Sequence, residues 1–352
     1  MDSFMHWQFG RSLGSDLLRD KREIRVYLDA FFGVRPRFHS WFSKLGIHLA
    51  SRPSCKAISI IEQWNLERCD KAQKLIAHGR QLTEDEPAIF AQAYKSLNGL
   101  RKEEIDPAPR DQTPPQPYPK RLELAADMFT FNAAALETSG NILTYAFFEL
   151  SRNAEIQEML RGELRGTFSP VPSADGENTE LPSPKDVNGL PYLDAILMET
   201  LRRYPSIPGP QPRVVPSTCS LGGYDRIPEG TVVHCAAYSL HHTPWVFPDP
   251  EVWRPKRWLE ASPEELRCMR RWFWAFGSGG RMCIGTHFAV SCESALYFLF
   301  RADIIMKAMK YVIAAVYSTF RSRIHDHGDM EQSDGYLAGS RGQHLELMFE
   351  RA

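Results

Sequence analysis

The sequence has almost no net charge and no long hydrophobic run, and each absence excludes a class of protein. Its 352 residues carry a formal net charge of -1, so nothing in the charge favours nucleic acid or an anionic membrane as a partner. No window approaches about twenty uncharged apolar residues, the length of a membrane-spanning helix. Residues 1–21 lack the pattern of a signal peptide. We therefore expect neither a membrane span nor a secretory signal in the printed chain.

The cysteines and glycines lack the spacings of several common sites. The seven cysteines form no Cys-x-x-Cys pair and no Cys/His set with zinc spacing. An odd, scattered set indicates reduced thiols in a cytosol-facing protein rather than a disulfide framework. Gly277, Gly279 and Gly280 do not form the Gly-x-Gly-x-x-Gly fingerprint of a dinucleotide site. The chain therefore carries no nicotinamide or flavin motif of its own.

Helical periodicity dominates what is present. With 43% hydrophobic residues the chain can bury a large core, and apolar residues recur at helical spacing through residues 1–102. The aromatic residues of this part are expected in the core rather than in a cofactor site; they are Phe31, Phe32, Trp41 and Phe42. Residues 103–120 are rich in proline, which predicts a loop or linker.

Residues 121–165 contain no proline and are apolar on most sides, which predicts one long buried helix. Glu137, Thr138 and Ser139 lie within it, and such polar groups are costly to bury unless they find partners or perform chemistry. Taken alone, the hydroxyls could simply bond back to the preceding turn.

Residues 192–204 predict an amphipathic helix that ends at Pro205. Glu199 and Arg202 lie three apart on one face of it, a spacing that usually indicates a surface ion pair of little value. Short strands are expected at residues 213–215, 221–224 and 231–237, with turns at Gly222-Gly223 and at residues 228–230. His241 and His242 are expected to point in opposite directions on a strand, which argues against a shared metal.

The stretch from Phe276 to Gly285 concentrates the chemistry. It holds Cys283 among glycines, with Arg281 two residues earlier and a helical pattern following. The glycines allow a flat ligand to approach the backbone closely. A nearby guanidinium and a helix N-terminus favour the thiolate, the form of cysteine that binds metal.

This stretch resembles the heme-binding signature of the cytochrome P-450 family, Phe-x-x-Gly-x-Arg-x-Cys-x-Gly. The fixed positions are matched by Phe276, Gly279, Arg281, Cys283 and Gly285. The resemblance implies the mainly α fold of that family with small β-sheets (α+β), as one partial domain over residues 1–352. It also implies a heme b iron ligated by Cys283.

The resemblance implies roles for residues elsewhere. Residues 134–139 resemble the oxygen-binding helix, with Glu137 and Thr138 at the positions that deliver protons and Ala135 replacing the usual glycine. Glu199 and Arg202 match the family's Glu-x-x-Arg helix. Residues 253–258 resemble its Phe-x-Pro-Glu-Arg-Phe segment, with tryptophan for both phenylalanines, Lys256 for the glutamate, and Arg257 retained to complete a charged network beneath the heme loop. Arg213 and Arg281 are implied to bind heme propionates. Ala134, Ile207 and Leu337 are implied to line the substrate pocket.

The implied function is a monooxygenase that inserts one oxygen atom from O2 into a hydrophobic small molecule. The implied electron source is NADPH through a separate NADPH-cytochrome reductase. The family typically resides on the cytosolic face of the endoplasmic reticulum membrane. The sequences of residues 273–276 and 309–315 are similar to those of fungal members that act in secondary metabolism.

Two features depart from the family pattern. The beginning resembles the family's middle helices, so an N-terminally truncated chain is expected, and residues 290–307 interrupt the helix that should follow Gly285. A retained intron explains that interruption, with a genuine insertion as the alternative, and sequencing the transcript distinguishes the two. The alternatives to a working enzyme are an inactive remnant that no longer holds heme and a helical interaction protein in which Cys283 is an ordinary thiol.

Overall fold

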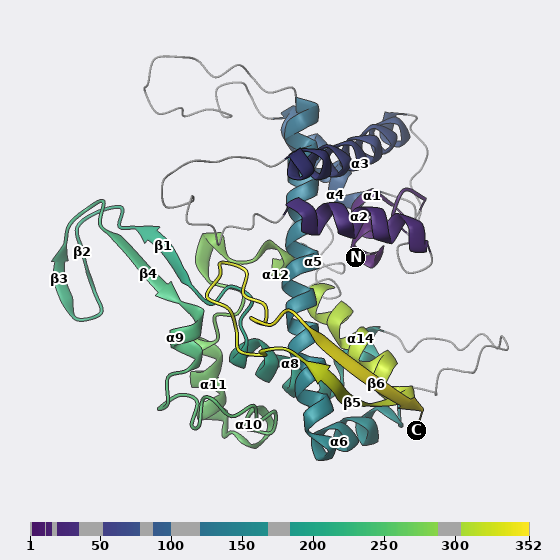
Figure 1. Ribbon diagram of the computed structural model, residues 1–352. Helices are drawn as coiled ribbons and strands as arrows, with labels where there is room; N and C mark the ends of the chain where they lie inside the picture. Colours follow the sequence, from purple (N-terminus) through teal and green to yellow (C-terminus); the bar gives the residue numbers. More distant parts are fainter. Residues whose placement is uncertain are drawn as a thin grey trace. The chain divides into compact units, whose positions relative to one another are not determined.

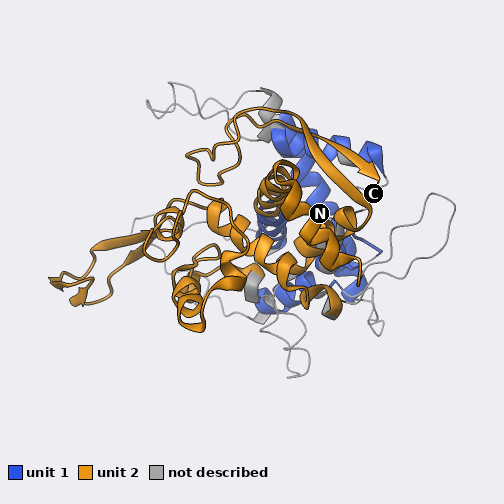
Figure 2. Ribbon diagram, turned by 90° about the horizontal axis from the view of Figure 1, so that it is seen from below, with its two compact units in different colours: residues 1–136 blue, residues 137–352 orange. Residues whose placement is uncertain are grey.

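The computed structural model describes residues 2–10, 12–15, 20–34, 52–77, 87–99, 120–167, 184–287 and 304–351. These residues are mostly helical with three small antiparallel sheets, which confirms the expected mainly α fold class (Figure 1). The chain divides into two compact units, residues 1–136 and 137–352 (Figure 2).

The first unit is helical, as the sequence predicts. Its helices are α1 (Asp2–Phe9), α2 (Lys21–Val34), α3 (Arg52–Ala77), α4 (Ala88–Gly99) and the beginning of α5 (Lys120–Arg152). A core cluster joins α2 and α3 through Tyr27, Phe31 and Ile61. Phe31 is thus in the core as expected, whereas the core prediction for Phe32 is wrong, because its side chain is 51% exposed. Trp41 and Phe42 lie outside the described residues.

The single long helix predicted over residues 121–165 is wrong, because two helices occupy this stretch. Helix α5 ends at Arg152 and α6 spans Ala154–Leu164, with Asn153 between them in a non-helical conformation. The Asn153 side-chain nitrogen donates to the Glu149 carbonyl at 2.8 Å. A short amide side chain that bonds to the backbone in this way competes with the helical pattern.

The core of the second unit packs around α8 (Pro191–Arg203), which ends as predicted just before Tyr204 and Pro205. Its buried apolar face includes Leu193, Ile196 and Leu197. This face packs into one cluster with α5, α6, α7 (Pro184–Asn188) and α14 (Ile304–Thr319). The buried face explains why α8 is stable, since each fully buried leucine or isoleucine contributes roughly 1.5–3 kcal/mol.

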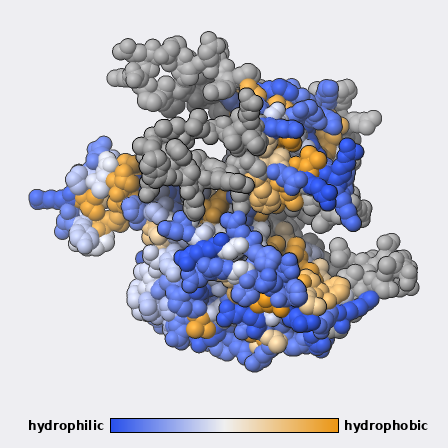
Figure 3. Space-filling view, in the orientation of Figure 1, coloured by the Kyte–Doolittle hydropathy of each residue, from blue (hydrophilic) through white to orange (hydrophobic). Residues whose placement is uncertain are grey.

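Three two-stranded antiparallel sheets lie in the second unit. Strand β1 (Pro210–Val214) pairs with β4 (Val232–Ala236), β2 (Cys219–Leu221) with β3 (Tyr224–Ile227), and β5 (Phe320–His327) with β6 (Leu345–Arg351). The turn expected at Gly222-Gly223 is confirmed as the turn of the β2–β3 hairpin, where both glycines have positive φ, at 61° and 83°. That pair of angles suits the twist of a two-residue hairpin. Residues 221–224 are therefore not one strand, because β2 ends and β3 begins within them. Figure 3 shows hydrophobic residues on these hairpins, where Val214 and Val232 are exposed.

Short helices connect β4 to the Cys283 stretch. They are α9 (Ala237–His241), α10 (Arg257–Glu260), α11 (Pro263–Trp272), the 3-10 helix η2 (Gly279–Arg281) and α12 (Ile284–His287). Ser262 and Glu265 form a capping box that begins α11.

Helix α14 begins at Ile304, inside the stretch 290–307 that has no counterpart in the family pattern, and it contains the helix expected at residues 309–317. Residues 288–303 lie outside the described part of the chain, so most of the proposed interruption does too. Among the helices that are described, none combines the length and the hydrophobicity needed to cross a membrane.

Candidate heme-thiolate site

Cys283 lies at the end of a tight loop that backbone hydrogen bonds close. Its amide donates to the Phe276 carbonyl at 2.7 Å, and the Gly277 amide donates to the Trp274 carbonyl at 3.0 Å. Met282 donates to Gly279 across η2. The Cys283 side chain is half-buried, and Gly285 follows in the first turn of α12. The loop therefore fixes the backbone on both sides of the sulfur-bearing residue.

Two glycines of this loop adopt backbone angles that other residues rarely reach. Gly277 has φ of 67° and Gly279 has φ of 72°. A Cβ added to Gly277 would also lie 2.8 Å from the Gln211 side-chain oxygen on β1. The backbone conformation at Gly277 therefore favours glycine, whereas the end of the flexible Gln211 side chain could shift to relieve the contact.

A buried charged network is connected to the segment before this loop through His241, which contacts both Arg202 and Trp274. Glu199 is fully buried on α8, and its Oε1 accepts from Arg202 Nη2 at 2.8 Å and Arg257 Nε at 3.0 Å. Its Oε2 accepts from Arg202 Nε at 2.9 Å. The three residues that the sequence grouped are thus in direct contact, with a two-pronged Arg202–Glu199 pair of the kind that fixes geometry.

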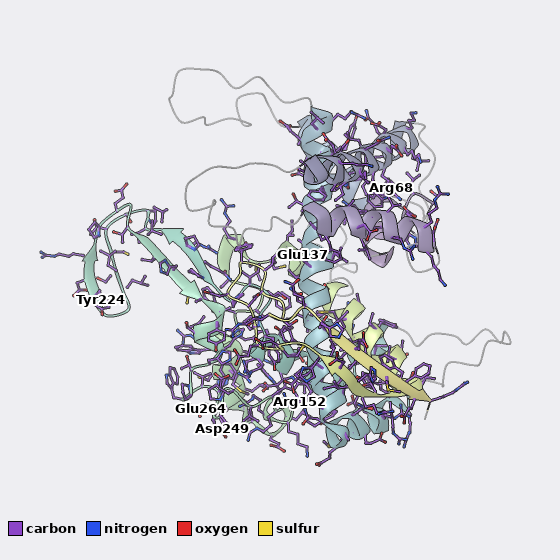
Figure 4. All side chains as sticks on the ribbon, viewed as in Figure 1. Arg68, Glu137, Arg152, Tyr224, Asp249 and Glu264 are labelled. Carbon is purple, nitrogen blue, oxygen red and sulfur yellow. The ribbon has the colours of Figure 1, made fainter. Side chains whose placement is uncertain are left out.

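The two arginines also bind backbone carbonyls of the segment before α10. Arg202 Nη1 donates to the Pro250 carbonyl at 2.8 Å. Arg257 donates to the carbonyls of Pro248 and Asp249 at 2.8 and 3.3 Å, and Figure 4 labels Asp249 in this part of the unit. Burial lowers the pKa of Arg257, and the Glu199 carboxylate opposes that shift by favouring the charged form. The network thus supplies hydrogen-bond donors to the backbone carbonyls of this segment and holds it in place.

The two tryptophans that replace phenylalanine in the family segment add donors that phenylalanine lacks. Trp258 Nε1 donates to Glu199 Oε2 at 3.0 Å, and Trp253 Nε1 donates to Thr200 Oγ1 at 3.1 Å. Both indoles are 7% exposed. A buried indole N–H generally needs such a partner. Trp258 therefore belongs to the charged network. From the sequence alone it was expected only to replace a phenylalanine of the family segment.

Replacing Trp258 by phenylalanine is expected to lower the free energy of unfolding by about 1.5–3 kcal/mol, because a buried carboxylate loses a donor. The matched control is Trp253→Phe, which removes the same indole N–H from a neutral hydroxyl and should cost about 1 kcal/mol. Denaturant unfolding of both variants measures the difference. An equal or larger loss for Trp253→Phe would show that bonding to Glu199 is not the cause.

Arg213 and Arg281, the two candidates for binding propionates, both lie at the Cys283 loop. Arg213 extends from β1, and its Nη2 lies 3.4 Å from the Ser278 carbonyl. Arg281 is the last residue of η2. Both side chains are exposed, as groups that bind a ligand from outside the core should be. Phe276 is half-buried and packs against the main core cluster of this unit.

Glu137 and Thr138 lie on α5 with half-buried side chains (Figure 4 labels Glu137). The Ser206 hydroxyl donates to the Thr138 carbonyl at 3.0 Å. This bond joins the helix to the segment that follows α8. The sequence did not single out Ser206, whose hydroxyl carries no local signal of a partner 68 residues away.

The segments of two expected pocket residues, Ile207 and Leu337, are adjacent. The Ala338 amide donates to the Ser206 carbonyl at 2.9 Å, and the Gln332 side chain donates to the Pro205 carbonyl at 2.8 Å. Ile207 and Leu337 are both half-buried. Ala134 belongs to the first unit, where its side chain is exposed.

The donor set suits an iron that brings most of its own ligands. In the described part of the chain, no cluster of three or more His, Cys, Asp or Glu side chains could hold a bare metal ion. A porphyrin iron needs only one protein ligand on its proximal side, for which a single thiolate suffices. Cys283, with two arginines at its loop, fits heme in this respect.

His241 is not on a strand, so the reason given for its orientation was wrong. It is the last residue of α9 and is fully buried. Its ring nitrogens contact the backbone of Arg202 and of Trp274. From the sequence, His241 was considered only together with His242, as an improbable metal pair. Its actual partners could not be predicted because they are distant in sequence.

Comparisons with known proteins agree with this geometry. The chain matches the Cytochrome P450 family model over residues 58–298. It is similar to cytochrome P450 monooxygenase aneF of Aspergillus aculeatus, 33% identical over 51% of this chain and 34% of that protein. It is also similar to cytochrome P450 monooxygenase avaI of Aspergillus versicolor, 29% identical over 74% of this chain and 59% of that protein. Cytochrome P450 3A12 of Canis lupus familiaris is 34% identical over 48% of this chain and 31% of its own length.

The matched segments therefore span less than two thirds of each of these relatives. The family model nevertheless covers more than half of this chain, including Cys283 and the charged network. This chain belongs to the cytochrome P450 family.

Proposed function

We propose that this protein is a heme-thiolate monooxygenase that inserts one oxygen atom from O2 into a hydrophobic small molecule. The observation that carries the proposal is the Cys283 loop. Its cysteine amide is fixed to Phe276, and its preceding segment is tied to a buried Glu199–Arg202–Arg257 network. A loop held this firmly presents one sulfur in a fixed position, as a metal ligand requires.

Each candidate residue has a role in this proposal. Cys283 would ligate the iron of heme b, and Arg213 and Arg281 would pair with its propionates, since guanidinium matches carboxylate geometry. Bound heme supplies the oxygen chemistry, and the protein supplies the axial ligand, hydrogen bonds and burial that tune it. Glu137 and Thr138 would hold and deliver protons. Ile207, Leu337 and Ala134 would contact the apolar substrate.

The proposed electron source is NADPH through a separate NADPH-cytochrome reductase, because the sequence contains no dinucleotide fingerprint. Several relatives are cytochrome P450 monooxygenases of fungi, which supports a fungal secondary metabolite as substrate. The proposed location is the cytosolic face of the endoplasmic reticulum membrane, although two relatives are named as mitochondrial enzymes. Fractionation of expressing cells distinguishes the two compartments.

An absorption spectrum of the purified full chain, supplied with heme b, tests the proposal. We expect a strongly red-shifted Soret band in the reduced carbon-monoxide complex, the signature of thiolate ligation. Turnover with a reductase and a panel of hydrophobic compounds then tests activity. Absence of heme binding would overturn the proposal and support one of the two alternatives, the remnant that no longer holds heme or the interaction protein. Heme binding without turnover on any compound of the panel would contradict the monooxygenase activity.

Replacing Thr138 by alanine is expected to uncouple NADPH consumption from product formation. Proton delivery by a positioned group contributes roughly 100-fold or more to rate, so the ratio of product to NADPH should fall at least about tenfold. The control is Thr144→Ala on the same helix, whose hydroxyl donates to the Gly140 carbonyl at 2.9 Å. Full coupling in Thr138→Ala, or equal uncoupling in both variants, would contradict the role.

A further inference from the structure

The imidazole of His241 joins the charged network to the Cys283 loop. Its Nδ1 lies 3.0 Å from the Arg202 carbonyl oxygen, and its Nε2 lies 2.7 Å from the Trp274 amide nitrogen. The ring stacks on Phe273, with centroids 5.2 Å apart and planes 12° apart. The residue is 0% exposed. The ring is therefore held on two edges and one face.

The two partners define the state of the ring. A carbonyl oxygen only accepts hydrogen bonds, so Nδ1 must carry the proton, and an amide N–H only donates, so Nε2 must present its lone pair. The imidazole is consequently the neutral Nδ1–H tautomer. Burial lowers the pKa of His241 to about 3, with the Arg202 charge acting in the same direction. The neutral form thus persists at any pH at which the protein would be studied.

The hydrogen bonds continue on both sides of the ring. Arg202 accepts from His241 through its own carbonyl, and its guanidinium binds Glu199 and the His241 carbonyl, the latter at 3.1 Å. On the other side, the Trp274 carbonyl accepts from Gly277, and the Phe276 carbonyl accepts from Cys283. Hydrogen bonds and the backbone of the turn therefore connect the buried ion pairs, through His241 and Trp274, to the Cys283 amide.

We infer that His241 is a positioning residue that links the Glu199–Arg202–Arg257 network to the Cys283 loop, so that the sulfur is held where it would ligate the heme iron. The inference rests on the proposed function in one respect, that Cys283 ligates heme. The physical reason is that the Trp274 amide is the first group of the loop turn. Without His241 the part-buried Trp274 N–H would lose its protein partner, and the turn that follows would loosen.

The adjacent histidine offers a matched control. His242 bonds through Nδ1 to the Tyr238 carbonyl at 2.8 Å and contacts the Arg203 side chain through Nε2 at 3.2 Å. Its ring stacks on Tyr238, with centroids 4.0 Å apart. His242→Phe therefore makes the same chemical change one residue away, with partners outside the Cys283 loop.

The first experiment compares His241→Phe, His241→Gln and His242→Phe in the full chain with heme b. The readout is the ratio of thiolate-ligated to other heme in the reduced carbon-monoxide spectrum. We expect His241→Phe to lower this ratio roughly tenfold, the effect of one buried hydrogen bond. His241→Gln, which keeps a donor and an acceptor, should recover part of it, and His242→Phe should match the wild type. An unchanged ratio in His241→Phe would overturn the inference.

The second experiment needs no heme and separates this inference from the proposed function. In protein without heme, the Trp274 and Cys283 amides should exchange with solvent roughly tenfold faster in His241→Phe than in the wild type or His242→Phe. Unchanged exchange would overturn the loop-holding role. If the wild type shows no thiolate-ligated heme, the proposed function fails. The exchange rates would still show whether His241 stabilises the Cys283 loop.

A measurement on the wild type covers the case in which His241→Phe does not fold. Nitrogen-15 NMR of labelled histidine should report the Nδ1–H tautomer for His241, with Nε2 shifted as a hydrogen-bond acceptor. An Nε2–H tautomer would be incompatible with acceptance from Trp274 and would overturn the inference. The Nδ1–H tautomer, together with partial recovery in His241→Gln, supports it.

Discussion

Cys283→Ala is expected to abolish the red-shifted Soret band of the reduced carbon-monoxide complex, and with it all monooxygenase turnover. The sulfur would be the one protein atom bonded to iron, and alanine offers no substitute. The fold should survive, because the Cys283 backbone amide, which donates to Phe276, is unaffected by the change. The side chain is only half-buried, so its loss should cost less than a core truncation.

Two measurements separate this expectation from general damage. Thermal unfolding of Cys283→Ala without heme should match the wild type to within about 1 kcal/mol, the range of a partly exposed substitution. The control is Cys268→Ala, since Cys268 is a half-buried cysteine on α11 in the same unit. It should leave the red-shifted band intact. A normal band in Cys283→Ala would mean that another residue ligates the iron.

The sequence predicted those parts of the site that depend on short spacing. Glu199 and Arg202 are three residues apart on a helix, so their contact follows from helix geometry alone. Their burial does not follow, because the same spacing usually marks a surface pair. Arg257, 58 residues from Glu199, was found only through the family resemblance. Helix α8 and the strands β1 and β4 were likewise predicted to within a few residues.

The features that the sequence did not reveal depend on partners that are distant in the chain. No sequence pattern links His241 to its hydrogen-bond partners. Arg202 lies 39 residues before it and Trp274 lies 33 residues after it. The position of His241 on a helix also means that the alternation of side chains along a strand does not apply to it. Trp258 appeared to be a conservative aromatic replacement until its indole N–H was located beside Glu199.

Local side-chain competition explains another difference. Asn153 interrupts the predicted long helix although no proline or glycine marks the position, because its amide bonds to the Glu149 backbone. Glu149 itself is buried and accepts from the Tyr204 hydroxyl at 2.6 Å. Burial raises the pKa of Glu149, and the Tyr204 bond opposes that shift. The periodicity of apolar residues cannot predict these side-chain hydrogen bonds, and therefore it cannot predict where the helix ends.

Glu199→Gln is expected to be the most destabilising change in the charged network. The substitution keeps the shape of the side chain but leaves the guanidinium groups of Arg202 and Arg257 buried without a carboxylate, with side chains 0% and 2% exposed. Breaking a buried ion pair from one side costs roughly 3–5 kcal/mol. That is a large part of the 5–15 kcal/mol by which proteins of this kind are typically stable. We therefore expect heme content after expression to fall to a small fraction of the wild type.

The control for this prediction is Asp70→Asn, because Asp70 also forms a two-pronged pair with an arginine. Arg121 Nε and Nη2 donate to the two Asp70 carboxylate oxygens at 2.7 Å each, but the side chains of Arg121 and Asp70 are 49% and 40% exposed. Water replaces a lost partner at such a site, so the cost should be about 0–1 kcal/mol. Denaturant unfolding without heme measures both variants. If the two substitutions cost the same, burial of the network does not govern its contribution. If Glu199→Gln costs about 2–5 kcal/mol more than the control and also loses heme, the network stabilises the fold and, through His241, the loop that presents Cys283.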